Sequence, residues 1–366
     1  MRFPEFSGEW KLHATTDYFE FKNGLNPEAK RFGLGTKFIS VMDILNNRYI
    51  TYDKVIASVL PKDDDLKEFG VNYGDILFQR SSETLEDVGR ANVYLDDKTA
   101  LFGGFVIRGK KIGNYNPLFF RYLLSSPNAR KSIIVKGAGA QHFNISQDGL
   151  SKVLLNVPSI QEQEKISQFI NYIDERIDTQ SKIIEQLQSL IKGIVVSITA
   201  ETPNTRIDKC LVCHSTTLQE NQIEDFGDFP VYGANGVCGY TVNADFNEPA
   251  ILIVKDGSGV GNVRFVNGKF SVIGTQNILT PQNKFFLKYI FYCLQAFNFV
   301  PYKTGMAIPH IYFKDYGKAK IYCPNFEQQV KIASQIDLIE SKIEIETQLL
   351  NKYEEQKKFL LSNMFI

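Results

Sequence analysis

Two glycine-rich segments of the chain carry residue types that contact nucleic acid in proteins. The first, Lys136-Gly-Ala-Gly-Ala-Gln-His-Phe-Asn144, combines a cation, flexible backbone, two amides and an imidazole, and Lys303-Thr-Gly-Met-Ala-Ile-Pro-His310 occupies an equivalent place later in the chain. Lysine can neutralise a phosphate, and Gln or Asn can pair with adenine in a major groove. Taken singly, each of these residues is also typical of a solvated surface. The candidates for DNA contact are Lys136, Gly137, Gly139, Gln141, His142 and Asn144, and then Lys303, Thr304, Gly305 and His310.

Basic and hydroxyl side chains near two expected strands extend this set. Gly74-Asp-Ile-Leu-Phe-Gln-Arg80 is typical of a turn that leads into a short apolar strand, and Ala250-Ile-Leu-Ile-Val254 is typical of a buried strand. Side chains close to these strands are candidates for phosphate or guanine contacts. They are Arg80, Ser81, Ser82 and Arg90 in the first half of the chain, and Lys255, Ser258 and Arg264 in the second.

The segment Gly257-Ser-Gly-Val-Gly261 resembles a nucleotide-binding loop. A dinucleotide fold requires a helix after the glycines, whereas Asn262-Val-Arg-Phe-Val266 is typical of a strand. A hairpin or a nest of backbone amides is the better interpretation. Such a nest can hold a DNA phosphate.

Other motifs indicate no catalytic centre, metal or cofactor. Cys210-Leu-Val-Cys213-His214 matches the pattern of covalent haem attachment, but that chemistry needs export, and the first ten residues lack the apolar region of a signal peptide. No second ligand pair has the spacing of a zinc site, and Asp63-Asp-Asp-Leu-Lys67 is typical of a charged surface turn. The sequence contains no ATPase G-x-x-x-x-G-K-[ST] segment and no Asn/Asp-Pro-Pro-Tyr/Phe tetrapeptide of an amino-methyltransferase. The four histidines are too isolated to nominate a catalytic triad.

Composition limits the kind of DNA contact and the compartment. The 366 residues include 41 basic and 41 acidic side chains, so the net charge is zero, which disfavours a broadly basic DNA-binding face. Local basic patches or a charged partner would have to supply the attraction. We expect a cytoplasmic protein without a membrane segment, because no run approaches about 20 apolar residues. Five scattered cysteines do not form a disulfide framework.

The elements that position these residues are duplicated at an offset of 166 residues. Pro158-Ser-Ile-Gln-Glu-Gln-Glu-Lys-Ile166 aligns without a gap on Pro324-Asn-Phe-Glu-Gln-Gln-Val-Lys-Ile332. Apolar residues then recur at alternating steps of four and three in both copies, which is the spacing of a coiled-coil seam. Both series are interrupted by a polar residue at the same step, Gln180 and Glu346. The seam residues are Ile166, Ile170, Ile173, Ile177, Ile184 and Leu187, and then Ile332, Ile336, Ile339, Ile343 and Leu350.

The repeat predicts two globular modules, each followed by one long helix. The expected domains are residues 1–157 and 201–323, with helices over 158–200 and 324–366. A helix of this length with one apolar seam is not stable alone in water, and antiparallel pairing within the chain is the simplest solution. The alternative is that the helices mediate homodimerisation. Within the first module, residues 101–108 are expected to form one strand that contains two glycines.

In this order and with this duplication, the motifs resemble those of specificity subunits of type I restriction–modification systems. The resemblance covers nearly the whole chain. It rests on Gly74-Asp-Ile-Leu-Phe-Gln-Arg-Ser-Ser82, Val231-Tyr-Gly-Ala-Asn-Gly-Val-Cys-Gly-Tyr240, Asp256-Gly-Ser-Gly-Val-Gly-Asn-Val263, and Pro158-Ser-Ile-Gln-Glu-Gln163 with the helix that follows. The resemblance implies an α+β fold with a pseudo-twofold internal repeat. In that fold, two mixed α/β target recognition domains are separated by two long helices that form an antiparallel coiled coil.

The resemblance also implies a function. Each recognition domain would read one half of a split sequence in double-stranded DNA, and the helices would dock adenine methyltransferase subunits, and ATP-dependent restriction subunits where the host has them. The chain itself would perform no chemistry. Two features depart from an ideal repeat: Glu162 is replaced by Gln328 in the second copy, and no tryptophan there corresponds to Trp10. A solitary DNA-binding or scaffold protein, and an enzyme with an unrecognised site, are the alternatives.

Overall fold

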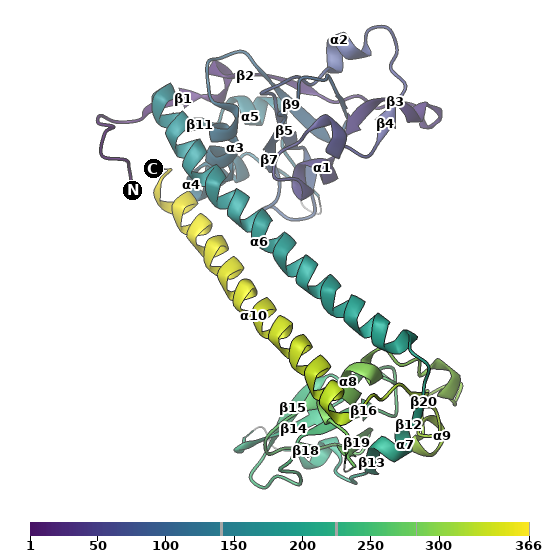
Figure 1. Ribbon diagram of the computed structural model, residues 1–366. Coiled ribbons are helices and arrows are strands. Elements are labelled where there is room, and N and C mark those ends of the chain that lie inside the picture. Colours follow the sequence, from purple (N-terminus) through teal and green to yellow (C-terminus); the bar gives the residue numbers. More distant parts are fainter. Residues whose placement is uncertain (140–141, 224–225, 283, 366) are drawn as a thin grey trace. The chain divides into compact units, whose positions relative to one another are not determined.

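The computed structural model describes residues 1–139, 142–223, 226–282 and 284–365, and within it the chain forms two compact units (Figure 1). The first unit contains Met1–Thr179 and the chain from Leu349 onward, and the second contains Gln180–Gln348. Each unit therefore combines one globular half of the chain with part of both long helices.

The first unit is built on a four-stranded antiparallel sheet in the order β2-β9-β5-β7. A three-stranded sheet, β4-β3-β8, joins β3 to β8 in parallel, and two short antiparallel pairs, β1-β11 and β6-β10, complete the strands. The strands are β1 (Lys11–Ala14), β2 (Phe19–Asn23), β3 (Phe32–Ile39), β4 (Ser58–Val59), β5 (Ile76–Gln79), β6 (Ser81–Ser82), β7 (Ala91–Val93), β8 (Leu101–Phe102), β9 (Val106–Lys111), β10 (Phe143–Asn144) and β11 (Leu154–Val157).

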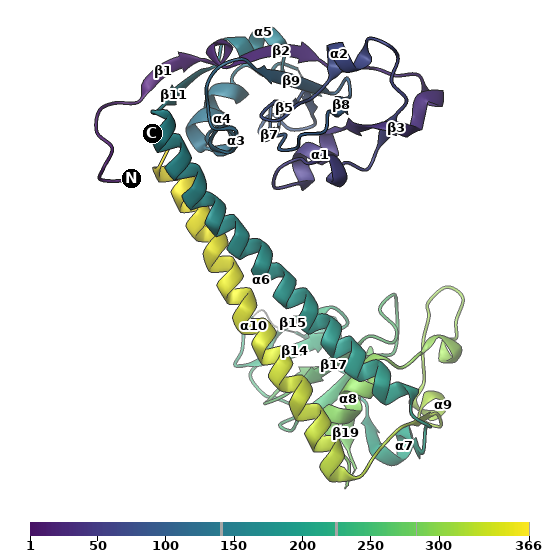
Figure 2. The same ribbon diagram turned by 45° about the horizontal axis from the view of Figure 1, so that its top comes forward.

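Short helices pack around this sheet. Figure 2 shows α3 and α4 on the side of the sheet nearest the long helices, and their apolar side chains share one core with β5 and β9. Both helices begin with a side-chain cap followed by proline: Asn116 accepts a hydrogen bond from the Phe119 amide, and Ser126 from the Ala129 amide. The helices are α1 (Val41–Asn46), α2 (Asp65–Phe69), α3 (Pro117–Ser125), α4 (Pro127–Ile134) and α5 (Gln147–Ser151).

The second unit repeats this topology. Its four-stranded sheet has the order β13-β19-β16-β17, its three-stranded sheet β15-β14-β18 contains one parallel pair, and β12 pairs with β20 as β1 pairs with β11. The strands are β12 (Thr205–Arg206), β13 (Leu211–His214), β14 (Phe229–Gly233), β15 (Gly236–Thr241), β16 (Ala250–Val254), β17 (Val263–Val266), β18 (Ser271–Val272), β19 (Gln276–Pro281) and β20 (Lys320–Ile321). The helices are α7 (Ile207–Cys210), α8 (Leu287–Gln295) and α9 (Phe313–Tyr316). The duplication thus extends from the helices to the sheets.

The long helices are α6 (Ile160–Ala200) and α10 (Phe326–Asn363), and they pair antiparallel. In the first unit, Ile166 and Ile170 share a core cluster with Leu360 and Met364, while Asp174 bonds to Lys357, nearer the middle of α10. The residue number therefore rises along one helix as it falls along the other.

The part of the helix pair in the second unit shows the same direction. Val195 and Ile198 share a core cluster with Ala333 and Ile336. Gln180 and Glu346, the two polar residues in the expected seams, are both buried, and the Gln180 amide donates a hydrogen bond to the Glu346 carboxylate. All the expected seam residues are buried or half-buried, and Ile166, Ile170, Ile173 and Ile336 are buried.

One sequence-based expectation is wrong. Residues 101–108 do not form one strand, because the segment changes sheets at Gly103–Phe105: Leu101–Phe102 pairs with β3, whereas Val106 begins β9. One stretch of α6 is long and apolar enough to cross a membrane by length and composition alone. A single stretch of this kind is weak evidence for a span, and the expectation of no membrane segment stays a prediction.

Candidate nucleic-acid interface

Both glycine-rich segments are closed by the same pair of backbone hydrogen bonds. In the first unit, the amides of Ala138 and Asn144 each donate to the other residue's carbonyl, at 2.9 and 2.8 Å. In the second unit, Thr304 and His310 exchange the same two hydrogen bonds at the same distances. The two loops therefore have the same length and the same closure.

Glycine is required at one position in each loop. Gly139 has a φ of 142° and Gly305 a φ of 88°. A Cβ atom would lie 2.0 Å from the His142 carbonyl oxygen in the first loop, and 2.3 Å from the Ile308 oxygen in the second, which no side chain tolerates. The alignment of Gly139 on Gly305 in the sequence therefore reflects a positive φ at both positions.

A cation stands at the base of each loop. Arg80 follows β5 and Lys255 follows β16, the corresponding strand of the other sheet. The amide of the residue after each loop, Ile145 or Ile311, donates to the carbonyl of this cation at 2.9 Å. Arg80 and Lys255 are thus held in equivalent places by equivalent backbone contacts.

In the first unit these residues surround a polar hollow of about 500 Å³. Arg80, Lys136 and Asn144 line it together with Gln147 and Asp148. Arg80 donates to the Gly104 carbonyl at 3.2 Å, and the Ser81 hydroxyl donates to the Asn144 side chain. The structure therefore brings three of the predicted residues together at one cavity.

The remaining predicted residues of the first unit lie around this hollow or away from it. Ser82 pairs with Phe143 in the short β6-β10 ladder, and Lys136, Gly139 and His142 are exposed. Gly137 precedes the loop and is half-buried. Arg90 lines a different pocket and pairs with Asp87 at 2.6 Å. Gln141 lies outside the described residues.

In the second unit, two predicted loops are joined to each other. Asp256 and His310 form a backbone bridge, and the Gly257 amide donates to the Pro309 carbonyl at 3.0 Å. Lys255, Thr304 and Gly305 therefore belong to one cluster of loops, and Lys303 and Ser258 lie next to it in sequence. Arg264 instead lies over the ring of Tyr232, with its guanidinium 5.9 Å from the ring centroid.

The proposed amide nest at Gly257–Gly261 is largely occupied by internal hydrogen bonds. The amides of Gly257, Val260 and Gly261 donate to the carbonyls of Pro309, Gly257 and Val254. These amides are not free to bind a phosphate. The loop serves instead to hold the neighbouring loop that carries Thr304 and Gly305.

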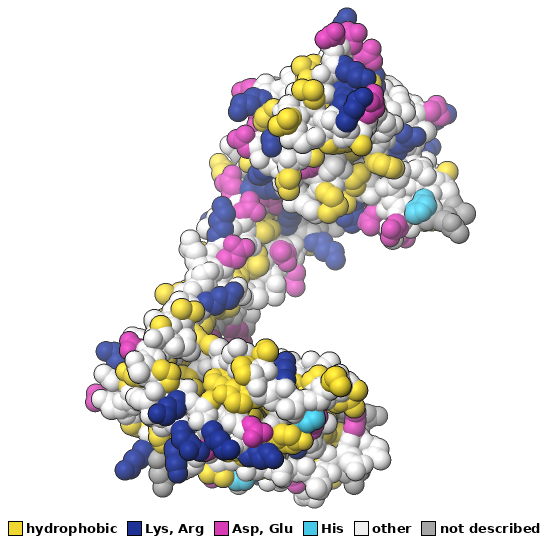
Figure 3. All heavy atoms as spheres, turned by 90° about the vertical axis from the view of Figure 1, so that its right-hand side faces the viewer, with side chains coloured by type: hydrophobic (Ala, Val, Ile, Leu, Met, Phe, Trp, Pro, Cys, Tyr) yellow, Lys and Arg dark blue, Asp and Glu magenta, His cyan; other side chains and the backbone are white. Residues whose placement is uncertain are grey.

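Basic side chains are gathered locally although the net charge is zero. On the face shown in Figure 3, Lys and Arg side chains of the second unit form a group beside hydrophobic ones, whereas basic and acidic side chains are interspersed on the first unit. A local group of cations can attract a polyanion without a basic overall composition.

The cysteine motif begins in the core of the second unit and ends at the exposed His214. Cys210 is buried with its sulfur 3.8 Å from that of Cys323, and His214 bonds to the Thr280 hydroxyl at 2.8 Å. Burial raises the pKa of the Cys213 thiol to about 11, so this thiol is protonated near neutral pH. Among the described residues, no group of three His, Cys, Asp or Glu side chains is placed to hold a metal ion.

A glutamine in each repeat motif fastens its globular half to a long helix. The Gln163 side chain accepts a hydrogen bond from the Asn116 amide and donates to the Pro158 carbonyl, both at 3.0 Å. Gln329 does the same with the Phe286 amide and the Pro324 carbonyl, at 3.0 and 2.8 Å. Asn116 and Phe286 are the N-cap residues of α3 and α8, so each glutamine joins a short helix to a long one.

A buried tyrosine makes a second equivalent contact. The Tyr122 hydroxyl donates to the Asp174 carboxylate at 2.7 Å. The Tyr292 hydroxyl lies within hydrogen-bond distance of two carboxylates, Asp337 at 2.6 Å and Glu340 at 2.8 Å. Burial, and then the carboxylate contact, raises the pKa of both phenols. No role of these tyrosines or glutamines was predicted from the sequence. The two glutamines recur at the 166-residue offset of the repeat, whereas the two tyrosines lie 170 residues apart and do not.

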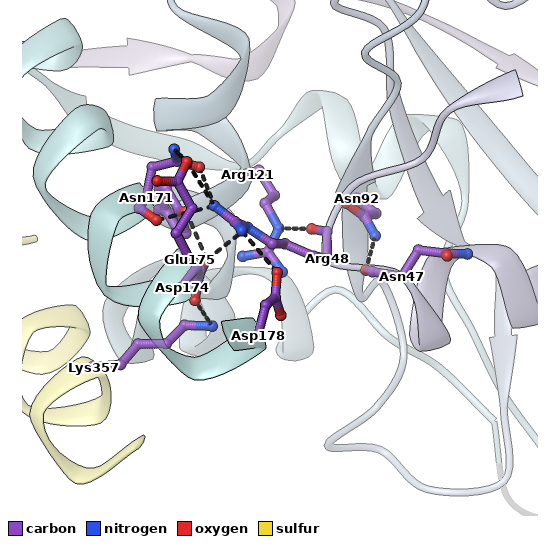
Figure 4. Close-up of polar contacts among 10 residues, drawn as sticks. Asn47, Arg48, Asn92, Arg121, Asn171, Asp174, Glu175, Asp178 and Lys357 are labelled. Atoms are coloured by element: carbon purple, nitrogen blue, oxygen red, sulfur yellow. Dashed lines mark hydrogen bonds and ion pairs between the residues drawn. The ribbon is translucent and has the colours of Figure 1, made fainter. Parts of the chain in front are cut away.

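An arginine completes this junction in the first unit (Figure 4). Arg48 donates to the Asp178 carboxylate at 2.9 Å and to the Asn171 carbonyl at 3.0 Å, and it lies 3.6 Å from Asp174. In the second unit Lys288 lies 3.2 Å from Asp337 and 3.7 Å from Glu340. The cation is Arg48 in the first unit and Lys288 in the second. In both units it lies against acidic side chains of a long helix.

Glu162 and Trp10, the two residues that depart from the ideal repeat, contact each other. The Glu162 carboxylate is buried and accepts hydrogen bonds from Arg2, at 2.7 Å, and from the Trp10 indole, at 3.2 Å. Gln328 at the equivalent place is exposed. The N-terminal segment of the first unit therefore explains both the extra tryptophan and the buried carboxylate.

Comparison with known proteins identifies the family. The family model described as the type I restriction modification DNA specificity domain matches residues 7–189 and again 211–355. The chain belongs to this family. The two matched segments correspond to the two copies of the internal repeat, so the family domain is present twice.

Curated relatives agree with this membership. The chain is 22% identical over 409 residues to a protein named as the MjaX type I restriction enzyme specificity subunit of Methanocaldococcus jannaschii, and the match covers 98% of this chain and 93% of the relative. It is 24% identical over 202 residues to the EcoKI specificity subunit of Escherichia coli, covering 54% of this chain and 43% of that relative.

Solved structures of type I specificity subunits share the fold. The S subunit from M. genitalium superimposes with a TM-score of 0.62 at 17% identity, covering 100% of this chain and 99% of that one. A chain from a structure titled as the complex assembly and conformational transition of the type I restriction–modification system gives a TM-score of 0.58 at 12% identity. That match covers 98% of this chain and 97% of the other.

Proposed function

We propose that the chain is the non-catalytic DNA-recognition subunit of a type I restriction–modification complex. Each globular half would read one half of a bipartite target in double-stranded DNA. The helices α6 and α10 would dock two adenine methyltransferase subunits and, where present, ATP-dependent restriction subunits. Methylation and cleavage would belong to those partners, the chain itself would need no cofactor, and the complex would act in the cytoplasm.

The proposal rests on a cation and a glycine loop that occur together once in each unit. Arg80 and Lys255 occupy equivalent positions, and each stands at the base of a glycine loop of the same closure. Two copies of one contact surface suit a ligand that presents two half-sites. Cations would contact phosphates and position the protein, whereas side chains on the loops would contact base edges.

The recognition residues that we assign are those beside the two loops. They are Arg80, Ser81, Ser82, Lys136, Gly137, Gly139, Gln141, His142 and Asn144 in the first half, and Lys255, Ser258, Lys303, Thr304, Gly305 and His310 in the second. Arg90 and Arg264 lie outside these clusters, so we assign them to the flanks of the interface.

Co-expression with the adenine methyltransferase of the same host tests the proposal. We expect the chain to purify with the methyltransferase, and we expect binding-site selection on the complex to return two short sequences separated by a spacer of fixed length. A single uninterrupted site, or no methyltransferase partner, would favour a solitary DNA-binding protein. Methyl transfer or cleavage by the purified chain alone would show that it is an enzyme.

A further inference from the structure

Three arginine side chains line a pocket of the first unit, and the proposed function uses only Arg90 of the three, at the flank of the interface. The pocket encloses about 440 Å³ and lies among α1, β7, α3 and α4. Arg90, Arg121 and Arg130 line it, and Glu86 is the acidic residue among the lining residues. The lining is therefore cationic although the chain has no net charge.

Arg130 is held in place and has one unused nitrogen. Its Nη2 donates to the carbonyls of Glu86 and Val88, at 2.8 and 2.7 Å. Its Nη1 is buried and has no hydrogen-bond partner among the described residues. A buried donor without a partner is unfavourable, and a bound acceptor would satisfy it.

Arg121 is fixed by a backbone contact to the junction. Its Nε donates to the carbonyl of Arg48, whose own guanidinium is turned toward Asp178 and Asn171 on α6 (Figure 4). In the part of the chain that the structure describes, the Nη atoms of Arg121 donate no hydrogen bond. Asp174 and Asp178 interact with this guanidinium electrostatically, but neither is hydrogen-bonded to it.

Two of the charges in the pocket, those of Arg90 and Arg130, repel each other. Burial, and then the neighbouring Arg90, lowers the pKa of Arg130 to about 10, and burial lowers the pKa of Arg121. Arg90 is about half exposed and is paired with Asp87 at 2.6 Å, which neutralises only one of the three guanidinium groups. An anion in the pocket would offset both the repulsion and the cost of burial.

We propose that this pocket binds a phosphate group. The planar guanidinium fork matches phosphate oxygens, and two or three arginines that converge on one anion are a common arrangement for phosphate. The phosphate would accept hydrogen bonds from Nη1 of Arg130 and from the Nη atoms of Arg121, with Arg90 at the entrance. The group could belong to the backbone of bound DNA, which rests on the proposed function, or to a free phosphate or phosphate ester, which does not.

Binding of inorganic phosphate to the full-length chain tests the pocket directly. Equilibrium dialysis with labelled phosphate at constant ionic strength should show one site. Arg130→Met should weaken it at least tenfold and Arg90→Gln by about threefold, whereas Lys131→Gln should leave it unchanged. Lys131 is a matched control, because it is an exposed cation on the same helix, α4.

The salt dependence of binding to duplex DNA separates the two sources of phosphate. Each lost phosphate contact reduces the slope of log K against log salt by about 0.9. If the pocket holds a DNA phosphate, Arg130→Met reduces this slope, and Lys131→Gln does not. If both variants lose inorganic phosphate while the slope stays the same, the pocket binds a free phosphate or its ester.

The proposal is overturned if neither phosphate binding nor the salt dependence of DNA binding changes with Arg130→Met or Arg90→Gln. It is also overturned if Lys131→Gln has the same effect as these two variants. If Arg130→Met does not melt cooperatively, phosphate binding by the Arg90→Gln variant decides the question, because Arg90 is about half exposed. A wild-type chain that binds phosphate but no DNA would contradict the proposed function and leave the pocket supported.

Discussion

Gln163 and Gln329 show how a single side chain fixes the place where each globular half meets a long helix. Both are buried, and both satisfy one backbone amide and one backbone carbonyl that would otherwise lack partners. An unsatisfied buried polar group costs about 1–3 kcal/mol. These glutamines therefore contribute to stability well beyond an ordinary surface amide.

Replacing either glutamine by leucine should destabilise the unit to which it belongs. We expect Gln163→Leu or Gln329→Leu to cost about 2–4 kcal/mol, because an amide and a carbonyl lose their partners together. Gln328→Leu is the control, since Gln328 is adjacent in sequence and exposed. Thermal unfolding followed by calorimetry measures the effect. Equal melting temperatures for Gln329→Leu and Gln328→Leu would refute the assigned role.

Tyr122 and Tyr292 predict a loss of stability at alkaline pH. The pKa of each phenol is raised in the folded chain, whereas it is about 10 in an unfolded one. Below pH 10 both states keep the proton. Above it the unfolded state releases the proton first, so the stability that these groups contribute is lost as pH rises further.

The test compares wild type with the Tyr122→Phe, Tyr292→Phe double variant between pH 8 and 11. The variant should be less stable at pH 8, because buried Asp174 and the half-buried carboxylates beside Tyr292 lose a hydrogen-bond donor. Its melting temperature should fall less steeply above pH 10. A pH dependence as steep as that of wild type would show that these phenols do not titrate as described.

At the scale of elements, the two glycine loops were the part of the site best predicted from sequence. The alignment of Gly139 on Gly305 needs only the offset of the repeat, and the positive φ at both positions explains why glycine recurs. The coiled-coil seam was equally predictable, because its spacing is visible within one continuous segment of sequence. The contact between Gln180 and Glu346 followed from their matching positions in the two seams.

Contacts between distant segments were not accessible in this way. Arg48 reaches Asp178 across 130 residues, and Arg2 reaches Glu162 across 160, and no periodicity connects such pairs. The split of residues 101–108 between two sheets has the same origin, since it depends on which strands lie beside β8 and β9. One sequence without tertiary information does not specify these pairings.

Gly305 permits a test at this scale. Gly305→Ala places a Cβ against the Ile308 carbonyl in a left-handed backbone, so the loop must change shape. We expect binding to one half-site to weaken at least tenfold, while the melting temperature falls little because the loop is exposed. Gly268→Ala is the control, because Gly268 has nearly the same φ, 87°, and nothing within 4 Å of the added atom. Equal DNA affinity in both variants would exclude the loop from the interface.

At the scale of the whole molecule, the internal repeat is the organising feature. Both globular halves have the same strand order, and both are fastened to a long helix by an equivalent glutamine and an equivalent tyrosine. α6 and α10 are continuous helices that each run through parts of both units. We therefore propose that the helix pair sets the spacing between two independently read half-sites.

Exchange of one half tests the independence of the two readers. Replacing residues 1–157 by the corresponding domain of another family member should change one half-site and leave the other half-site and the spacer intact. The measurement is binding-site selection on the chimaera in complex with its methyltransferase. Changes in both half-sites would contradict independent reading.

The most direct measurement is the spacer length selected by a variant with one heptad inserted at matched positions in α6 and α10. Seven residues add about 10 Å to each helix and keep the seam facing its partner, which corresponds to about three base pairs. If the helix pair sets the spacing, we expect two unchanged half-sites separated by a spacer that is about three base pairs longer. A variant that folds and binds DNA with the original spacer would contradict it.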